Sequence, residues 1–121
     1  MSYQTTSRSG SDALNAAEFQ VELRQSAKFD RPLVIADPLA AALAQIEQHP
    51  SFAQSRLLTR ILSALTYADG TFRRAELSTL DLPTRGLALA LVNSSAEGSA
   101  PREAWVKAVD AANAAQLAAE S

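Results

Sequence analysis

The alternation of apolar and polar positions is clearest between residues 52 and 68, where apolar side chains recur every three or four residues. On a helical wheel one side of this segment is apolar, with the core candidates Leu58, Ile61, Leu62 and Leu65. The opposite side carries Arg56 and Arg60. Ser51 is a suitable N-cap and Gly70 a suitable stop. The pattern predicts an amphipathic helix that packs its apolar side against the rest of the chain and turns its arginines outward.

Two further helix starts share one capping chemistry, an aspartate followed closely by a proline. Asp37-Pro38 opens a predicted helix that ends at His49-Pro50, because the residue before a proline is pushed out of the α region. Asp81-Leu82-Pro83 opens a second helix, from Thr84 to Val92. The first of them should pack antiparallel to the helix at 52–68, since the connection between them is short.

The remaining C-terminal elements follow from local signals. Thr71 is suited to cap a short helix from Phe72 to Leu80. The polar stretch 93–98 is predicted as a loop. The last helix begins between Ser99 and Arg102, with Pro101 near its first turn.

The segment 17–36 fits two structures. Residues Phe19 to Arg24 alternate with period two, and Arg31 to Ala36 form a short apolar run, so the two can pair as a β-hairpin. Asp12 can instead cap a short helix that passes through Glu18. Strand and helix both stay open for this segment.

These elements predict a mainly α fold, a compact bundle of four to five helices with the option of a short N-terminal β-hairpin; the alternative is an α+β fold with a two-stranded ribbon on helices. The length of 121 residues suits one modest core. We therefore expect a single helical domain at 12–121. Residues 1–11 are polar and aperiodic, and we expect a disordered tail there. We find no internal repeat.

The amino-acid composition indicates where in the cell the protein is expected. The chain has no cysteine, which removes disulfides and thiolate chemistry. No run approaches the roughly 18 apolar residues of a membrane span, and the first residues lack an apolar leader, so we expect a cytoplasmic protein without a membrane partner. Arginine dominates over lysine, and alanine and leucine are abundant, which points to a GC-rich, bacterial genome.

Residue types that carry catalysis are scarce. The single histidine, His49, stands at a helix end, where a histidine is favourable without any catalytic role. A phosphate-binding loop needs closely spaced glycines, whereas these are isolated: Gly10, Gly70, Gly86 and Gly98. We predict no catalytic residues, no cofactor and no enzymatic activity.

The stretch from Asp69-Gly70 to Glu76 places carboxylates around a glycine. A calcium loop, however, needs oxygen ligands at alternate positions before that glycine, and Tyr67 supplies no carboxylate, so we predict no metal site. The string Ala68-Asp69-Gly70 followed by Glu76 is similar to the ADG-x-E pattern of helical tellurite-resistance-type domains over about one helix-turn-helix. Phe72-Arg73-Arg74 departs from that pattern, and we do not assign the chain to that family.

Charge provides the one candidate surface. Between residues 51 and 86 five arginines face three acidic residues, although the whole chain has a formal charge of −2. We name as candidate partner-binding residues Arg56, Arg60, Tyr67, Arg73 and Arg74. We predict a non-enzymatic protein-interaction or regulatory module that acts through a protein partner or self-association. The alternative is a small nucleic-acid-binding regulator with a helix-turn-helix-like segment around 52–81, in which Arg73 and Arg74 face the major groove.

Overall fold

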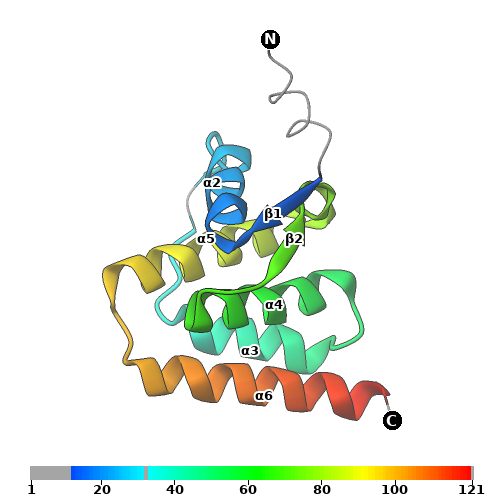
Figure 1. Cartoon of the computed structure of the whole chain (residues 1–121). Helices are drawn as coiled ribbons and strands as arrows, with labels where there is room; N and C mark the ends of the chain where they lie inside the picture. Colours follow the sequence, from blue (N-terminus) through cyan, green and yellow to red (C-terminus); the bar gives the residue numbers. More distant parts are fainter. Residues whose placement is uncertain (1–11, 32, 121) are drawn as a thin grey trace.

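The structure, a computed structural model, describes residues 12–31 and 33–120. Within these ranges the chain forms five α-helices, one 3₁₀ helix and two short strands (Figure 1). In chain order the elements are β1 (Ala13–Asn15), α2 (Ala16–Ser26), α3 (Pro38–Gln48), α4 (Ala53–Tyr67), β2 (Thr71–Arg73), η1 (Arg74–Thr79), α5 (Leu82–Glu97) and α6 (Arg102–Glu120). The predicted mainly α fold is confirmed. The predicted tail at 1–11 lies outside the described residues.

Helix α4 is the centre of the packing. Its Leu58 and Leu62 are fully buried and Ile61 nearly so, as the wheel predicts. The helix contacts α3, α5 and α6 as well as α2 and η1. In Figure 1, α6 runs along one side of the molecule against α3 and α4, while α2 and the two strands lie at the opposite side. Trp105 of α6 is buried in this shared core.

The two Asp-Pro helix starts are confirmed. The Asp37 carboxylate accepts a hydrogen bond from the Ala40 N–H at 3.1 Å, and Asp81 accepts one from the Thr84 N–H at 2.9 Å. Helix α5 continues to Glu97, so the predicted loop at 93–98 is wrong for most of its length. Ser94 in this stretch is buried, and Asn93 and Ser95 on either side of it are half-buried, so the helix packs against the fold here as well.

Residues 16–26 are helical, so of the two structures left open for this segment the helix is the one present over Phe19 to Arg24, and it is capped by Asn15 rather than Asp12. Asn15 and Glu18 form a capping box: the Asn15 side chain accepts from the Glu18 N–H, and the Glu18 side chain accepts from the Asn15 N–H. Phe19 and Leu23, one turn apart, are buried. Val21 between them is exposed, and this is what imitates the alternation of a strand.

A two-stranded sheet is present, but its strands are not the predicted ones. β1 pairs antiparallel with β2, and Leu14 lies opposite Phe72. Residues 33–36 form no strand. The predicted short helix from Phe72 to Leu80 is also wrong, because Thr71–Arg73 is β2 and only Arg74–Thr79 is helical, as the 3₁₀ helix η1.

The turn between α4 and β2 differs from prediction as well. Ala68, not Gly70, takes the left-handed conformation that ends α4, and its N–H bonds to the Ala64 carbonyl. Gly70 follows with a φ of 109°, which an L side chain rarely adopts. The chain therefore leaves the helix and turns at once into extended backbone.

The sheet relates two similar units, β1–α2 and β2–η1. In each, a strand leads into a helical segment whose third residue is a glutamate. Glu18 accepts the Asn15 N–H at 2.9 Å, and Glu76 accepts the Arg73 N–H at 2.8 Å. The rings of Phe19 and Phe72 stack between the units, with centroids 4.2 Å apart. The arrangement of a strand followed by a glutamate-capped helical segment thus occurs twice, although the sequence pattern indicated no internal repeat.

No helix within the described ranges combines the length and the continuous apolar character required to cross a lipid bilayer.

Candidate functional site

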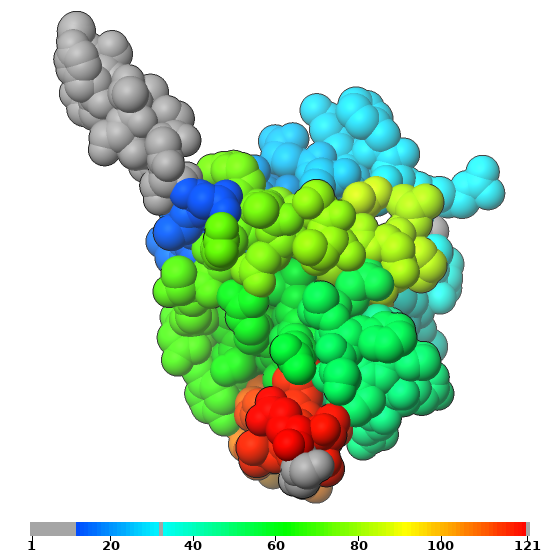
Figure 2. All heavy atoms as spheres, turned by 90° about the vertical axis from the view of Figure 1, so that its right-hand side faces the viewer, coloured from blue at the N-terminus to red at the C-terminus, as the bar shows by residue number. Residues whose placement is uncertain are grey.

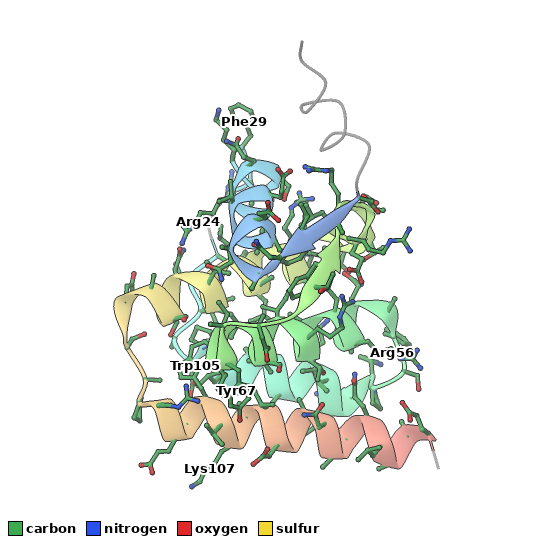
Figure 3. The ribbon with its side chains drawn as sticks, viewed as in Figure 1. Arg24, Phe29, Arg56, Tyr67, Trp105 and Lys107 are labelled. Carbon is green, nitrogen blue, oxygen red and sulfur yellow. The ribbon has the colours of Figure 1, made fainter. Side chains whose placement is uncertain are left out.

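The most exposed apolar side chains lie on the connection between α2 and α3, residues 27–37. Phe29 is 92% exposed and Val34 fully exposed, and Leu33 between them is about half exposed. Figure 2 shows this light-blue and cyan segment projecting from the upper right of the molecule. In Figure 3, Phe29 points away from the body at the end of α2. We call Arg24, Lys28, Phe29, Arg31, Leu33 and Val34 the connector surface.

Three contacts with α5 hold the connector surface in place. Arg85 donates two hydrogen bonds to the Asp30 carboxylate, at 2.7 and 2.9 Å, and Arg24 donates to the Asn93 side chain at 2.8 Å. The side chain of Leu33 lies so close to α5 that a Cβ at Gly86 would come within 2.5 Å of it. These contacts fix Asp30 and Leu33 against α5, although the described residues of the connection form no helix or strand.

A hollow of about 340 Å³ lies between the connection and α5. Its apolar lining includes Leu33, Leu89 and Ala90, and its polar lining includes the cations of Arg24, Lys28 and Arg31. The one carboxylate in the lining, Asp30, is already bonded to Arg85. Among the described residues, none of the three lining cations forms an ion pair. The hollow is thus apolar at its wall and positive at its rim.

Arg60, one of the predicted partner-binding residues, is bound to other parts of the fold. Its guanidinium donates to both carboxylate oxygens of Glu76 and, at 2.7 Å, to the carbonyl of Thr71. It also lies over the Phe72 ring, 5.0 Å from the centroid. Arg60 thus lies on the outward side of α4, as expected, but its guanidinium is bound to η1 and β2.

Arg73 and Arg74 are ion-paired with distant acidic residues. Arg73 meets Asp12 at 3.2 Å, and Arg74 meets Glu22 of α2 at 2.6 Å. These arginines lie on β2 and η1, not on the second α-helix that a helix-turn-helix places in the major groove. We call the three pairs Arg60–Glu76, Arg73–Asp12 and Arg74–Glu22 the ion-pair face.

The last two predicted residues lie at opposite ends of α4 (Figure 3). Arg56 is exposed near its start, and Tyr67 stands at its last residue, about 16 Å farther along the helix axis. Tyr67 lies 5.3 Å from the Arg102 guanidinium, measured to the ring centroid, and Arg102 also donates to the Thr66 carbonyl. The five predicted residues thus do not form one surface.

Glu76 is the carboxylate most strongly held on the ion-pair face. Partial burial alone would raise the pKa of its carboxyl group. Hydrogen bonds from Arg60 and from the Arg73 N–H, together with the two positive charges, outweigh burial and hold this pKa below its ordinary value. Glu76 is therefore ionised at neutral pH and bound to its partners.

Comparison with protein-family models, with curated proteins and with solved structures found no match to this chain. The described residues bring no three histidine, cysteine, aspartate or glutamate side chains close enough together to hold a metal ion.

Sequence reasoning missed the connector surface because it treated the run that includes Leu33, Val34 and Ile35 as a possible strand of a β-hairpin. The useful signal was their setting: a short apolar run next to a proline, preceded by Lys28 and Arg31 and followed directly by a helix cap. In the structure Val34 of this run is fully exposed, whereas Ile35 packs against the core.

Proposed function

We propose that this protein is a non-enzymatic interaction module that binds a segment of a partner protein through the connector surface. The observation that carries the proposal is the exposure of Phe29 and Val34, whose chain neighbours Lys28 and Leu33 line the hollow. Single exposed apolar residues are ordinary, but here an aromatic residue, a valine and a half-exposed leucine lie within six positions of the chain. Aromatic residues and arginines are the types enriched where protein interfaces gain most of their energy.

The chemistry of the hollow defines the partner. Its wall suits one apolar side chain, and the cations of Arg24, Lys28 and Arg31 suit carboxylates on either side of that anchor. We therefore expect a partner segment in which an apolar residue is flanked by aspartate or glutamate. A second copy of this chain fits less well, because two connector surfaces facing each other would bring these cations together.

The alternative, nucleic-acid binding, has weaker support. Arg60, Arg73 and Arg74, which would neutralise phosphates, each already meet a carboxylate of this chain. A phosphate would have to displace these carboxylates before it could bind.

The test is a differential capture experiment with the full chain as bait. The baits are wild type, a Phe29→Ser/Val34→Ser variant and a Phe52→Ser variant. Phe52 is a matched control because it is also exposed, at 56%, but lies between α3 and α4, where its ring stacks on His49. Lysate of the cells that produce the protein is passed over each bait, and retained proteins are quantified by mass spectrometry.

We expect one acidic partner to be retained by wild type and Phe52→Ser, and to be lost at least about tenfold from Phe29→Ser/Val34→Ser. Equal retention on all three baits would contradict the proposal. Light scattering that shows concentration-dependent growth of wild type alone would make a second copy the occupant instead. Binding of duplex DNA with a steep salt dependence that weakens in Arg73→Ala/Arg74→Ala would favour the alternative.

A further inference from the structure

Residues 65–76 follow the layout of a calcium loop in their second half. In that loop a glycine at the sixth position makes the turn, the carbonyl at the seventh position is a ligand, and a glutamate at the twelfth binds with both oxygens. Counted from Leu65, these positions are Gly70, Thr71 and Glu76. Gly70 has the positive φ of such a turn, 109°.

A cation already occupies the point where these ligands converge. The Arg60 guanidinium takes both carboxylate oxygens of Glu76 and the Thr71 carbonyl, which are the two ligands that this half of the loop would offer to a metal ion. Neither Arg73 nor Arg74 has such a set, since each is bonded through its side chain to one carboxylate from another element.

The elements next to residues 65–76 are also arranged as in a pair of calcium loops. Paired calcium loops are joined by a short antiparallel ribbon, and Phe72, at the eighth position, is paired in β2 with Leu14 of β1. The unit after β1 repeats the same glutamate, Glu18, three residues after the helix cap. The first half of the loop, in contrast, has Leu65 and Tyr67 where a calcium loop has carboxylates or other oxygen ligands.

We propose that residues 68–76, which follow the end of α4, form the second half of a calcium-type loop in which the guanidinium of Arg60 takes the place of the metal ion. The guanidinium of Arg60 carries one positive charge, whereas a calcium ion carries two. The single carboxylate of Glu76 is therefore sufficient to balance the charge, and the ligands of the first half of the loop are not needed. The loop, and with it the β1–β2 ribbon, keeps its shape at any calcium concentration. This inference concerns a different face from the connector surface and does not depend on the proposed function.

The experiment reverses the replacement. Tyr67→Asp returns an oxygen ligand at the third position, next to Asp69 at the fifth, and Arg60→Met removes the internal cation but keeps an unbranched side chain. Wild type, Tyr67→Asp and Arg60→Met/Tyr67→Asp are freed of metal with EDTA. Their thermal midpoints are then measured by circular dichroism in calcium chloride at about 10 mM and in sodium chloride of equal ionic strength.

We expect calcium to raise the midpoint of Arg60→Met/Tyr67→Asp by about 3 °C or more, and to leave wild type and Tyr67→Asp unchanged. Adding Glu76→Gln should abolish the calcium effect. If the double variant is unfolded without metal, the readout is the far-ultraviolet helix signal, which calcium should restore. The proposal is overturned if calcium has no effect on the double variant, or stabilises Tyr67→Asp equally while Arg60 is present.

Discussion

The ion-pair face and the connector surface are both rich in cations, but the structure uses those cations differently. Arg60, Arg73 and Arg74 each meet a carboxylate of the same chain. Arg24, Lys28 and Arg31 surround a hollow instead, and among the described residues none of them forms an ion pair. The first group holds elements together through ion pairs. In the second group Arg24 also links α2 to α5 through Asn93, but its charge, like those of Lys28 and Arg31, meets no carboxylate among the described residues.

This difference shows why a local excess of arginine is a weak guide to function. The acids that neutralise Arg73 and Arg74 are Asp12 and Glu22, which lie far away in the sequence. A charge count over neighbouring residues cannot include them. An interaction surface is better indicated by side chains that the fold leaves unsatisfied.

The largest stability effect should come from the core that supports both surfaces. Leu62→Ala should lower the free energy of unfolding by about 2 to 5 kcal/mol, because Leu62 is fully buried and its removal leaves a cavity. Urea denaturation measures this loss. A loss below about 1 kcal/mol would mean that α4 does not have the central place described above.

A smaller loss should separate Arg60 from its neighbour Arg56. Arg60→Met should cost about 1 to 2 kcal/mol, since it removes the bonds to Glu76 and to the Thr71 carbonyl. Arg56→Met is the matched control and should stay within about 0.5 kcal/mol of wild type. Equal losses would contradict the structural role of the ion-pair face.

The contribution of Glu76 should depend on pH. Because its folded-state pKa lies below the ordinary value of 4.5, ionised Glu76 stabilises the fold above that value, and the stabilisation is lost as the pH falls through the folded-state pKa. Glu76→Gln should therefore lower the thermal midpoint at pH 7 and lower it less at a pH well below 4.5. Glu47→Gln, at an exposed position on α3, is the matched control. The same midpoint difference at both pH values would contradict this account.

The smallest stability effect is expected on the connector surface. Phe29→Ser and Val34→Ser should each change the free energy of unfolding by less than about 0.5 kcal/mol, because these side chains are almost fully exposed. Urea denaturation of the single variants checks this. A loss above about 1 kcal/mol would show that the side chains pack against the fold and are not available to a partner.

The parts of the fold that sequence predicts well are those fixed by local chemistry. The helix starts at Asp37 and Asp81 depend on a cap bonding three residues ahead, and the apolar side of α4 depends on helical spacing alone. The β1–β2 pairing could not be predicted in this way, because Leu14 and Phe72 lie far apart in the chain and each strand has only three residues.

The ion pairs of the predicted arginines were harder to predict, again because they join distant parts of the chain. The partners of Arg73 and Arg74 depend on how the segment from Asp12 to α2 docks on β2 and η1, which no local pattern encodes. The α2 helix itself was open to prediction, because Asn15 and Glu18 have the spacing of a capping box. The period-two pattern from Phe19 to Arg24 obscured that signal.

The most direct test compares the two surfaces in binding to the captured partner. Its dissociation constant is measured by isothermal titration calorimetry for wild type, Phe29→Ser/Val34→Ser and Arg73→Ala/Arg74→Ala. We predict that the connector variant binds at least about tenfold more weakly and that the arginine variant binds like wild type. Weaker binding by the arginine variant, with wild-type affinity in the connector variant, would contradict the account.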